Sequence, residues 1–121
     1  MLNGEYVVVM YATFAALAEP NRFRIVELLR AGARPVNDIG VELDLAQPQV
    51  SKHLRVLKEV GLVEVEARAQ QRLYALDPAP LQELDRWLEK YRALWVERFD
   101  QLDEVINAAQ AQEKRRGRQK R

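Results

Sequence analysis

One short segment, residues 47–58, holds the side chains best suited to recognising another molecule. It contains three basic residues and no acidic one, although the first 112 residues of the chain carry a net negative charge. Its apolar residues recur at i, i+4 and i+7, and this spacing predicts one buried stripe along a helix. The stripe consists of Val50, Leu54 and Leu57. The remaining side chains of the segment are therefore predicted to face outward.

The outward side chains have the chemistry that reads nucleic-acid bases. A Gln amide can hydrogen-bond the edge of adenine, and an Arg guanidinium can do the same with guanine. Ser and Lys suit bases or phosphates, and the only histidine lies beside the buried stripe, where it is expected to be half packed. The predicted DNA contacts in this segment are Gln47, Gln49, Ser51, Lys52, His53 and Arg55. The plain alternative is an amphipathic helix with a solvated basic face.

The residues before this segment decide between the two interpretations, because they predict further helices in a characteristic order. An apolar run from Tyr6 to Ala18, interrupted only by Thr13, is too short for a membrane span of roughly 20 residues. It predicts a buried helix over about residues 7–18. Helices over about 20–30 and 36–43 follow, and a tight turn over 44–47 precedes the basic helix. Two short helices joined in this way form a helix-turn-helix unit.

Two strands are predicted directly after the basic helix. Residues 62–66 alternate partly and are rich in β-branched residues, residues 72–76 resemble a second strand, and a loop over 67–71 would join the two as a hairpin. Such a hairpin is the wing of a winged helix-turn-helix. Arg68 and Arg72 are predicted to contact phosphates or a minor groove from it. The alternative for both is a solvated hairpin tip.

The last predicted helix runs from about residue 81 to about residue 112. Apolar residues recur along it every seven positions, a pattern that is buried against another helix or a second copy of the chain. They are Leu81, Leu88, Trp95, Leu102 and Ala109. The first and last helices are therefore expected to form a homodimer interface. Residues 113–121 hold six of the 19 basic residues and one of the 18 acidic residues. They predict a disordered basic tail after a domain over 1–112.

Composition excludes several functions. The absence of cysteine excludes disulfides and zinc–thiolate sites and is compatible with a cytoplasmic protein. Nucleophilic catalysis needs a base beside the nucleophile. The only suitable group is Ser51-Lys52-His53, whose neighbouring positions on a helix diverge. No glycine-rich phosphate loop is present. We therefore expect no enzyme activity, no metal site and no cofactor.

Two stretches of the sequence resemble those of a known protein family. The stretch FAALAEPNRFRIVELL, residues 14–29, resembles the opening of the ArsR-type winged helix-turn-helix family. The stretch QPQVSKHLRVL, residues 47–57, followed by Gly61-Leu62-Val63, is similar to the recognition-helix motif of that family. The resemblance spans about residues 13–106. It implies a homodimer that binds an inverted repeat, represses transcription and generally releases DNA when an inducer binds.

The chain departs from the family pattern at its metal sites. Many members carry a Cys-x-Cys pair where this sequence has Pro35 and Asn37, and others use histidines of the last helix, which has none here. Transition metals prefer Cys and His ligands, so a metal sensor is not expected. Ala46 stands where the family often has a capping Ser. Four aromatic residues of the last helix could line an inducer pocket, although we expect them to be core. They are Trp87, Tyr91, Trp95 and Phe99.

Together these observations predict a mainly α fold with a β-hairpin wing. The predicted function is sequence-specific binding of double-stranded DNA by a homodimeric transcriptional repressor, with residues 47–58 in the major groove and the 62–76 hairpin as wing. The alternative is a winged-helix protein-interaction module that does not read DNA. The residues specify neither an inducer nor an operator sequence, and they do not separate repression from activation. No membrane partner is expected.

Overall fold

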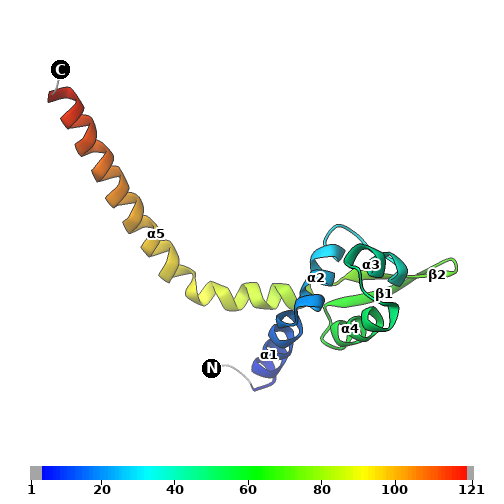
Figure 1. The fold of residues 1–121 in the computed structure, drawn as a ribbon. Coiled ribbons are helices and arrows are strands. Elements are labelled where there is room, and N and C mark those ends of the chain that lie inside the picture. Colours follow the sequence, from blue (N-terminus) through cyan, green and yellow to red (C-terminus); the bar gives the residue numbers. More distant parts are fainter. Residues whose placement is uncertain (1–3, 120–121) are drawn as a thin grey trace. The chain divides into compact units, whose positions relative to one another are not determined.

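The computed structural model describes residues 4–119, which form helices and one two-stranded sheet (Figure 1). The elements in chain order are α1 (Gly4–Ala18), α2 (Pro20–Leu29), α3 (Val36–Leu43), α4 (Gln47–Glu59), β1 (Val63–Arg68), β2 (Gln71–Leu76) and α5 (Ala79–Gln119). They divide into two compact units, Met1–Leu84 and Asp85–Arg121. The boundary between the units lies inside α5, whereas the sequence analysis placed the end of the folded domain at residue 112.

The core of the first unit confirms the predicted stripe of α4. Val50, Leu54 and Leu57 are all buried, and they belong to one apolar cluster with residues of α2, α3 and β1. Ile25 of α2 and Ile39 of α3 are fully buried in the same cluster. Since burial of each such side chain contributes about 1.5–3 kcal/mol, this cluster fixes which face of α4 turns inward.

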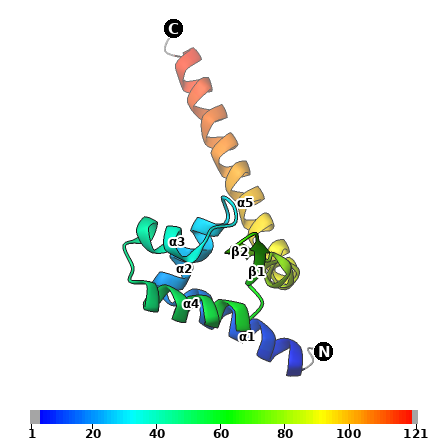
Figure 2. The same cartoon turned by 90° about the vertical axis from the view of Figure 1, so that its right-hand side faces the viewer.

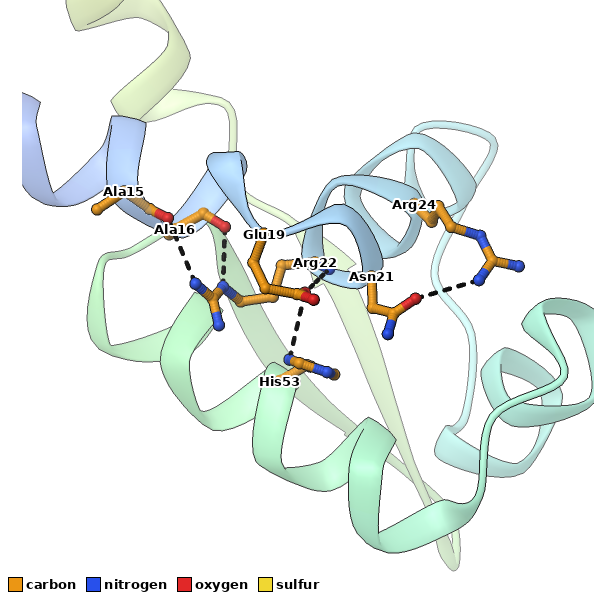
Figure 3. A network of polar contacts seen from close by, with 7 residues as sticks. All are labelled: Ala15, Ala16, Glu19, Asn21, Arg22, Arg24 and His53. Atoms are coloured by element: carbon orange, nitrogen blue, oxygen red, sulfur yellow. Dashed lines mark hydrogen bonds and ion pairs between the residues drawn. The ribbon is translucent and has the colours of Figure 1, made fainter.

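The junction between α1 and α2 is fixed by a polar network (Figure 3). The Glu19 carboxylate caps α2 by accepting the Arg22 backbone N–H at 2.8 Å. The Arg22 guanidinium reaches back, and its Nε donates to the Ala16 carbonyl at 2.8 Å near the end of α1. Pro20 occupies the first turn of α2, where no N–H is needed. The chain therefore changes direction here without leaving these helix-end groups unpaired.

Helix α1 begins at Gly4, earlier than the predicted start near residue 7. It was expected to be buried on several sides, but within one chain only Met10, Thr13 and Ala16 are buried. Large apolar side chains on its other faces are open to solvent, and Tyr11 is 73% exposed. A single chain therefore buries one side of α1, and the other side is the one that the dimer interface was expected to cover.

The turn between α3 and α4 depends on a close backbone approach at Gly40. The Leu45 N–H donates to the Gly40 carbonyl at 2.9 Å, and Asp44 adopts a left-handed conformation with φ 54°. A Cβ at residue 40 would lie 2.9 Å from the Leu45 carbonyl oxygen. Only glycine fits this turn without a backbone shift. The Arg24 guanidinium secures the same turn by donating to the Leu43 carbonyl at 2.9 Å.

The hairpin has a shorter loop than predicted. Strands β1 and β2 pair in antiparallel register from Val63↔Leu76 to Arg68↔Gln71, so the loop contains only residues 69 and 70. Ala69 adopts φ 53°, and a positive φ at the first loop position is typical of tight two-residue turns. The predicted loop over 67–71 was wrong. Residues 67, 68 and 71 also pair between the strands, although their side chains do not alternate between apolar and polar.

A third backbone segment joins the hairpin to the helices. The Arg34 N–H donates to the Tyr74 carbonyl at 3.0 Å, and the Tyr74 N–H donates to the Arg34 carbonyl at 2.9 Å. The Asp77 N–H donates to the Leu62 carbonyl at 2.8 Å at the open end of the hairpin. These bonds link β2 to the segment before α3 and to the start of β1. Figure 2 shows the hairpin with α3 and α4 in the first unit.

Helix α5 runs from Ala79 to Gln119, so it starts before and ends well after the predicted limits of about 81 and 112. Residues 113–119 are helical and not the disordered tail that the sequence analysis predicted; residues 120–121 lie outside the described residues. Lys, Arg, Gln and Glu favour helix, and Arg116 and Arg118 suit the negative end of the helix dipole. Within residues 4–119, no helix combines the length and apolar character that crossing a membrane requires.

Gly40 provides a test of the helix-turn-helix geometry. We expect Gly40→Ala to lower the free energy of unfolding by about 1–3 kcal/mol, because the added methyl group must displace the Leu45 carbonyl. Urea denaturation followed by circular dichroism measures the effect. Gly117→Ala is the control, since a Cβ there meets nothing within 4 Å and alanine is the better helix former. Equal stability of Gly40→Ala and the unaltered protein would contradict this account of the turn.

Candidate nucleic-acid interface

The exposed face of α4 carries most of the residues that the sequence predicts to contact DNA. Because the apolar stripe faces the core, the side chains between its members project to solvent. The exposed members of the predicted set on α4 are Gln47, Gln49, Ser51, Lys52 and Arg55. They are polar or basic, and residues 47–58 contain no carboxylate that would repel a phosphate.

A cleft of about 510 Å³ separates α4 from the hairpin. Helix α4 lines it with Ser51, Leu54, Arg55 and Lys58, and the hairpin lines it with Val65, Ala67, Arg72 and Tyr74. Three of these residues are cations and none is acidic. Arg55 and Arg72, which the sequence analysis placed on separate elements, therefore share one cleft. Its lining suits a polyanion.

Lys58 is a lining residue that the predicted site set did not include. It lies in the predicted recognition helix, but no contact was assigned to it. Ser51, Arg55 and Lys58 follow each other at i, i+4 and i+7, the same spacing as the buried stripe shifted by one residue. That spacing places all three on one helix face and could have identified Lys58 from the sequence.

Gln47 lies on a different surface from this cleft. It lines a groove of about 500 Å³ with residues of α3 and the following turn. The other lining residues are Val36, Asn37, Gly40, Val41, Asp44 and Leu45. The structure thus divides the predicted contacts, with Gln47 at the start of α4 beside α3 and with Ser51 and Arg55 beside the hairpin.

Gln49 has a local role at the start of α4. Its Oε1 accepts the Ala46 N–H at 3.3 Å, which is one half of a capping box. The other half is missing, since the alanine at the N-cap has no side-chain acceptor. A bidentate contact of Gln49 with adenine needs both its oxygen and its nitrogen. In the free protein the oxygen is engaged, so the predicted contact would require the amide to leave Ala46.

His53 is turned toward the α1–α2 junction (Figure 3). Its side chain is only 15% exposed, and its Nδ1 lies 3.7 Å from Oε2 of Glu19. That nitrogen is buried without a hydrogen-bond partner, because 3.7 Å is too long for a hydrogen bond. The expected half-packed position is observed, but the ring nitrogen Nδ1 faces another helix. This placement favours a role in positioning α4 over a contact with bases.

The two predicted arginines of the hairpin differ in their surroundings. Arg72 lines the cleft beside α4. Arg68 lies at the end of β1, where its guanidinium is 3.9 Å from the Glu66 carboxylate and both side chains are well exposed. Exposed ion pairs contribute little stability, so Arg68 can exchange this partner for another anion at small cost. Arg72 is the better placed of the two to act together with α4.

The aromatic residues of α5 do not form the core that was expected. Trp87 and Tyr91 pack with ring centroids 5.0 Å apart, but Tyr91, Trp95 and Phe99 are exposed, the last of them at 63%. A single chain therefore leaves Tyr91, Trp95 and Phe99 open to solvent, and an open groove of about 290 Å³ is lined by Tyr91, Leu94, Trp95 and Arg98. Residues 4–119 also contain no cluster of three or more potential ligands that could hold a metal ion.

Comparison with known sequences identifies the same region. A family described as "Helix-turn-helix domain" matches residues 17–66, which contain α2, α3 and α4. The HTH-type transcriptional regulator Rv2034 of Mycobacterium tuberculosis is 38% identical over 76 residues, which cover 63% of this chain and 71% of that protein. The transcriptional repressor SdpR of Bacillus subtilis is 29% identical over 79 residues, covering 65% of this chain and 88% of that protein.

A solved structure resembles the fold as well. The homodimeric winged helix-turn-helix DNA-binding domain of Mb0332 from Mycobacterium bovis, described as a possible ArsR-family regulator, superposes with a TM-score of 0.56. It is 28% identical to this chain, and the match covers 72% of this chain and 81% of that domain. These relatives are described as a transcriptional regulator, a transcriptional repressor and a possible ArsR-family transcriptional regulator.

The incomplete capping box leads to a prediction about Ala46. We expect Ala46→Ser to raise the free energy of unfolding by about 1 kcal/mol, because the serine oxygen can accept the Gln49 backbone N–H. Thermal and urea denaturation measure the gain. Ala46→Val is the control, since it adds bulk at the same position without an acceptor. If the serine and valine variants were equally stable, the cap would have no energetic role here.

Proposed function

The chain belongs to the ArsR-type family of winged helix-turn-helix regulators and is a DNA-binding transcriptional repressor, and on that premise we propose that it acts as a homodimer on an inverted-repeat operator. In this proposal the exposed face of α4 enters the major groove and the β1–β2 hairpin flanks it as a wing. The protein acts in the cytoplasm, where the operator lies.

One observation carries the proposed mode of binding: the carboxylate-free cleft between α4 and the hairpin. Arg55, Lys58 and Arg72 line it from both sides. When a recognition helix lies in the major groove, the sugar–phosphate backbone bordering that groove passes between the helix and the wing. The cleft supports this arrangement, since Lys58 and Arg72 would neutralise phosphates along that backbone while Arg55 lies beside them on α4.

The side chains of α4 then divide into two roles. Arg55, on the exposed face beside the cleft, is assigned to a guanine edge, and Lys52 and Ser51 to bases or phosphates. Gln47 and Gln49, at the start of the helix, are assigned to the neighbouring base pairs. His53 is assigned no base contact, because its Nδ1 faces Glu19. Lys58 and Arg72 are assigned to phosphates, which position the helix without reading sequence.

An inverted repeat requires two copies of α4 related by a two-fold axis. The solvent-exposed apolar residues of α1 and α5 support a dimer, because single chains rarely leave such surfaces open. Val8 and Tyr11 of α1 and Leu88 of α5 are among these residues. The similar domain of Mb0332 is homodimeric, which supports the same assembly here.

The DNA-reading role is tested by substituting the cleft residues one at a time. We expect Arg55→Ala to weaken binding to the specific site by roughly 1–3 kcal/mol and to relax its sequence preference. Lys58→Ala and Arg72→Ala should weaken binding to any duplex. Each should also reduce the slope of the logarithm of the binding constant against the logarithm of salt concentration, by about 0.9 for each phosphate that is no longer neutralised. Fluorescence anisotropy measures both effects, with DNA from the region upstream of the gene and a scrambled duplex as probes.

Lys90→Ala is the matched control for these variants, since it removes an exposed cation from α5, outside the cleft. It should bind both duplexes as the unaltered protein does. If the unaltered protein bound both duplexes equally weakly and lost them with salt, the proposed operator reading would be wrong. The alternative of a winged-helix module for protein interaction would then replace it.

The dimer is tested on α5. We expect Leu88→Glu to produce monomers, because two acidic side chains would enter the predicted apolar seam of the dimer. Analytical ultracentrifugation measures the mass. Val41→Glu is the control, since it places the same charge at an exposed apolar residue of α3, outside α1 and α5. A Leu88→Glu protein that still sedimented as a dimer would show that the interface lies elsewhere.

A further inference from the structure

The only histidine of the chain holds a buried nitrogen atom that no hydrogen bond satisfies. The His53 side chain is 15% exposed, and its Nδ1 lies 3.7 Å from Oε2 of Glu19 (Figure 3). Buried polar atoms without a partner are rare in folded proteins, because each has given up its hydrogen bonds to water. A charge-assisted hydrogen bond spans roughly 2.7–2.9 Å, so a shift of about 1 Å would join this nitrogen to the carboxylate.

The Glu19 carboxylate is held in place by the junction of α1 and α2. Its Oε2, the oxygen that faces His53, also accepts the Arg22 backbone N–H at 2.8 Å. The Arg22 guanidinium donates to the carbonyls of Ala15 and Ala16 at 3.3 and 2.8 Å, which fastens the start of α2 to the end of α1. Because the carboxylate is anchored on this side, closing the gap draws His53, and α4 with it, toward the junction.

Two charged side chains, Glu19 and Arg22, belong to the junction that His53 faces, and they act in opposite directions. The positive charge of Arg22 opposes protonation of the ring, and the negative charge of Glu19 favours it. Glu19 is the only acidic residue within 4 Å of a His53 nitrogen in residues 4–119. Helix α3 and strand β1 meet α4 through its apolar stripe, which packs with Ile39 and Val63. On α4 itself, the positions three and four residues from His53 carry no charge.

We propose that Glu19 is a positioning residue for DNA binding, which holds the protonated ring of His53 and thereby fixes α4 against the α1–α2 junction. A protonated imidazole carries a proton on both nitrogens, so Nδ1 then donates to the carboxylate. A neutral ring that carries its proton on Nε2 turns a lone pair toward the same carboxylate, which leaves the contact open. This role rests on the proposed placement of α4 in the major groove, because it links the position of that helix to a proton.

The sign of the pH dependence follows from this contact. DNA phosphates favour a positive charge on α4, and a firmly placed α4 favours binding, so the DNA complex holds the proton more tightly than the free protein does. A state that binds more protons is favoured at low pH. Operator affinity therefore falls as pH rises through the range of about 5–8 in which histidines change charge. His53 is the only histidine and cysteine is absent, so no other side chain of these two types contributes in that range.

Operator affinity of the full chain, measured by fluorescence anisotropy at about pH 6 and about pH 8, tests the proposal. We expect the affinity of the unaltered protein to fall by roughly tenfold over this range, through loss of the bound proton. Glu19→Gln removes the charge but keeps an oxygen that can accept the Arg22 N–H, so the cap of α2 is preserved. This variant should bind at both pH values as the unaltered protein does at the higher one. Glu27→Gln, the same change at an exposed residue of α2, should keep the full pH dependence.

His53→Gln completes a double-mutant cycle with Glu19→Gln. It removes the titrating ring, so it should also abolish the pH dependence, and the double variant should bind no more weakly than either single variant. A Glu19→Gln protein that retained the full pH dependence would show that the carboxylate does not act through His53. An unaltered protein whose operator affinity stayed constant, or rose, with pH would overturn the proposal as well.

NMR of the single imidazole ring separates this proposal from the proposed function. In the free protein at about pH 6, the Nδ1 proton should give a signal protected from exchange with water, because the carboxylate retains it. Glu19→Gln should lose that signal. Its absence from the unaltered protein, or its presence in Glu19→Gln, would overturn the contact. A protein that failed to distinguish the operator from a scrambled duplex at either pH would instead overturn the proposed function.

Discussion

The burial of one apolar stripe of α4 is the constraint on which the rest of the interface depends. Val50, Leu54 and Leu57 are held in the core shared with α2 and α3. A helix turns by a fixed angle at each residue, so burying these three side chains leaves only one orientation for the others. The outward direction of Arg55 and Lys58 is thus a consequence of packing. No interaction of the polar side chains themselves is needed to set it.

Orientation alone does not create a cleft, because the hairpin must also be held at a defined place beside α4. The backbone bonds between Arg34 and Tyr74 tie β2 to the segment before α3. The close approach of Gly40 to Leu45 sets the turn from α3 into α4. The Glu19 carboxylate caps α2 and lies 3.7 Å from Nδ1 of His53, so the α1–α2 junction packs beside α4. Rigid supports of this kind keep charged groups near the geometry that a nucleic acid requires.

Periodicity explains why much of this could be predicted from the sequence. Helix α3 has its predicted bounds, and the stripe of α4 is buried as expected, since both depend on local spacing. The bond between Gln49 and Ala46 and the position of Nδ1 of His53 were not predicted, because they depend on a helix cap and on a distant helix. The length of α5 was underestimated because the charged residues at its end were interpreted as a solvent-exposed tail. Lys, Arg and Glu also favour helix.

The two units of the chain differ in how completely they bury their own apolar surface. The first unit encloses a core of fully buried residues, whereas α5 beyond Leu84 leaves Leu94, Phe99 and Val105 more than half exposed. In the proposed dimer a second copy covers these side chains, so the stability of the associated form rises with protein concentration. A dimer formed through α5 brings two copies of α4 together. Because more of that dimer forms as protein concentration rises, occupancy of an inverted-repeat operator would depend on concentration more steeply than binding by one copy of α4.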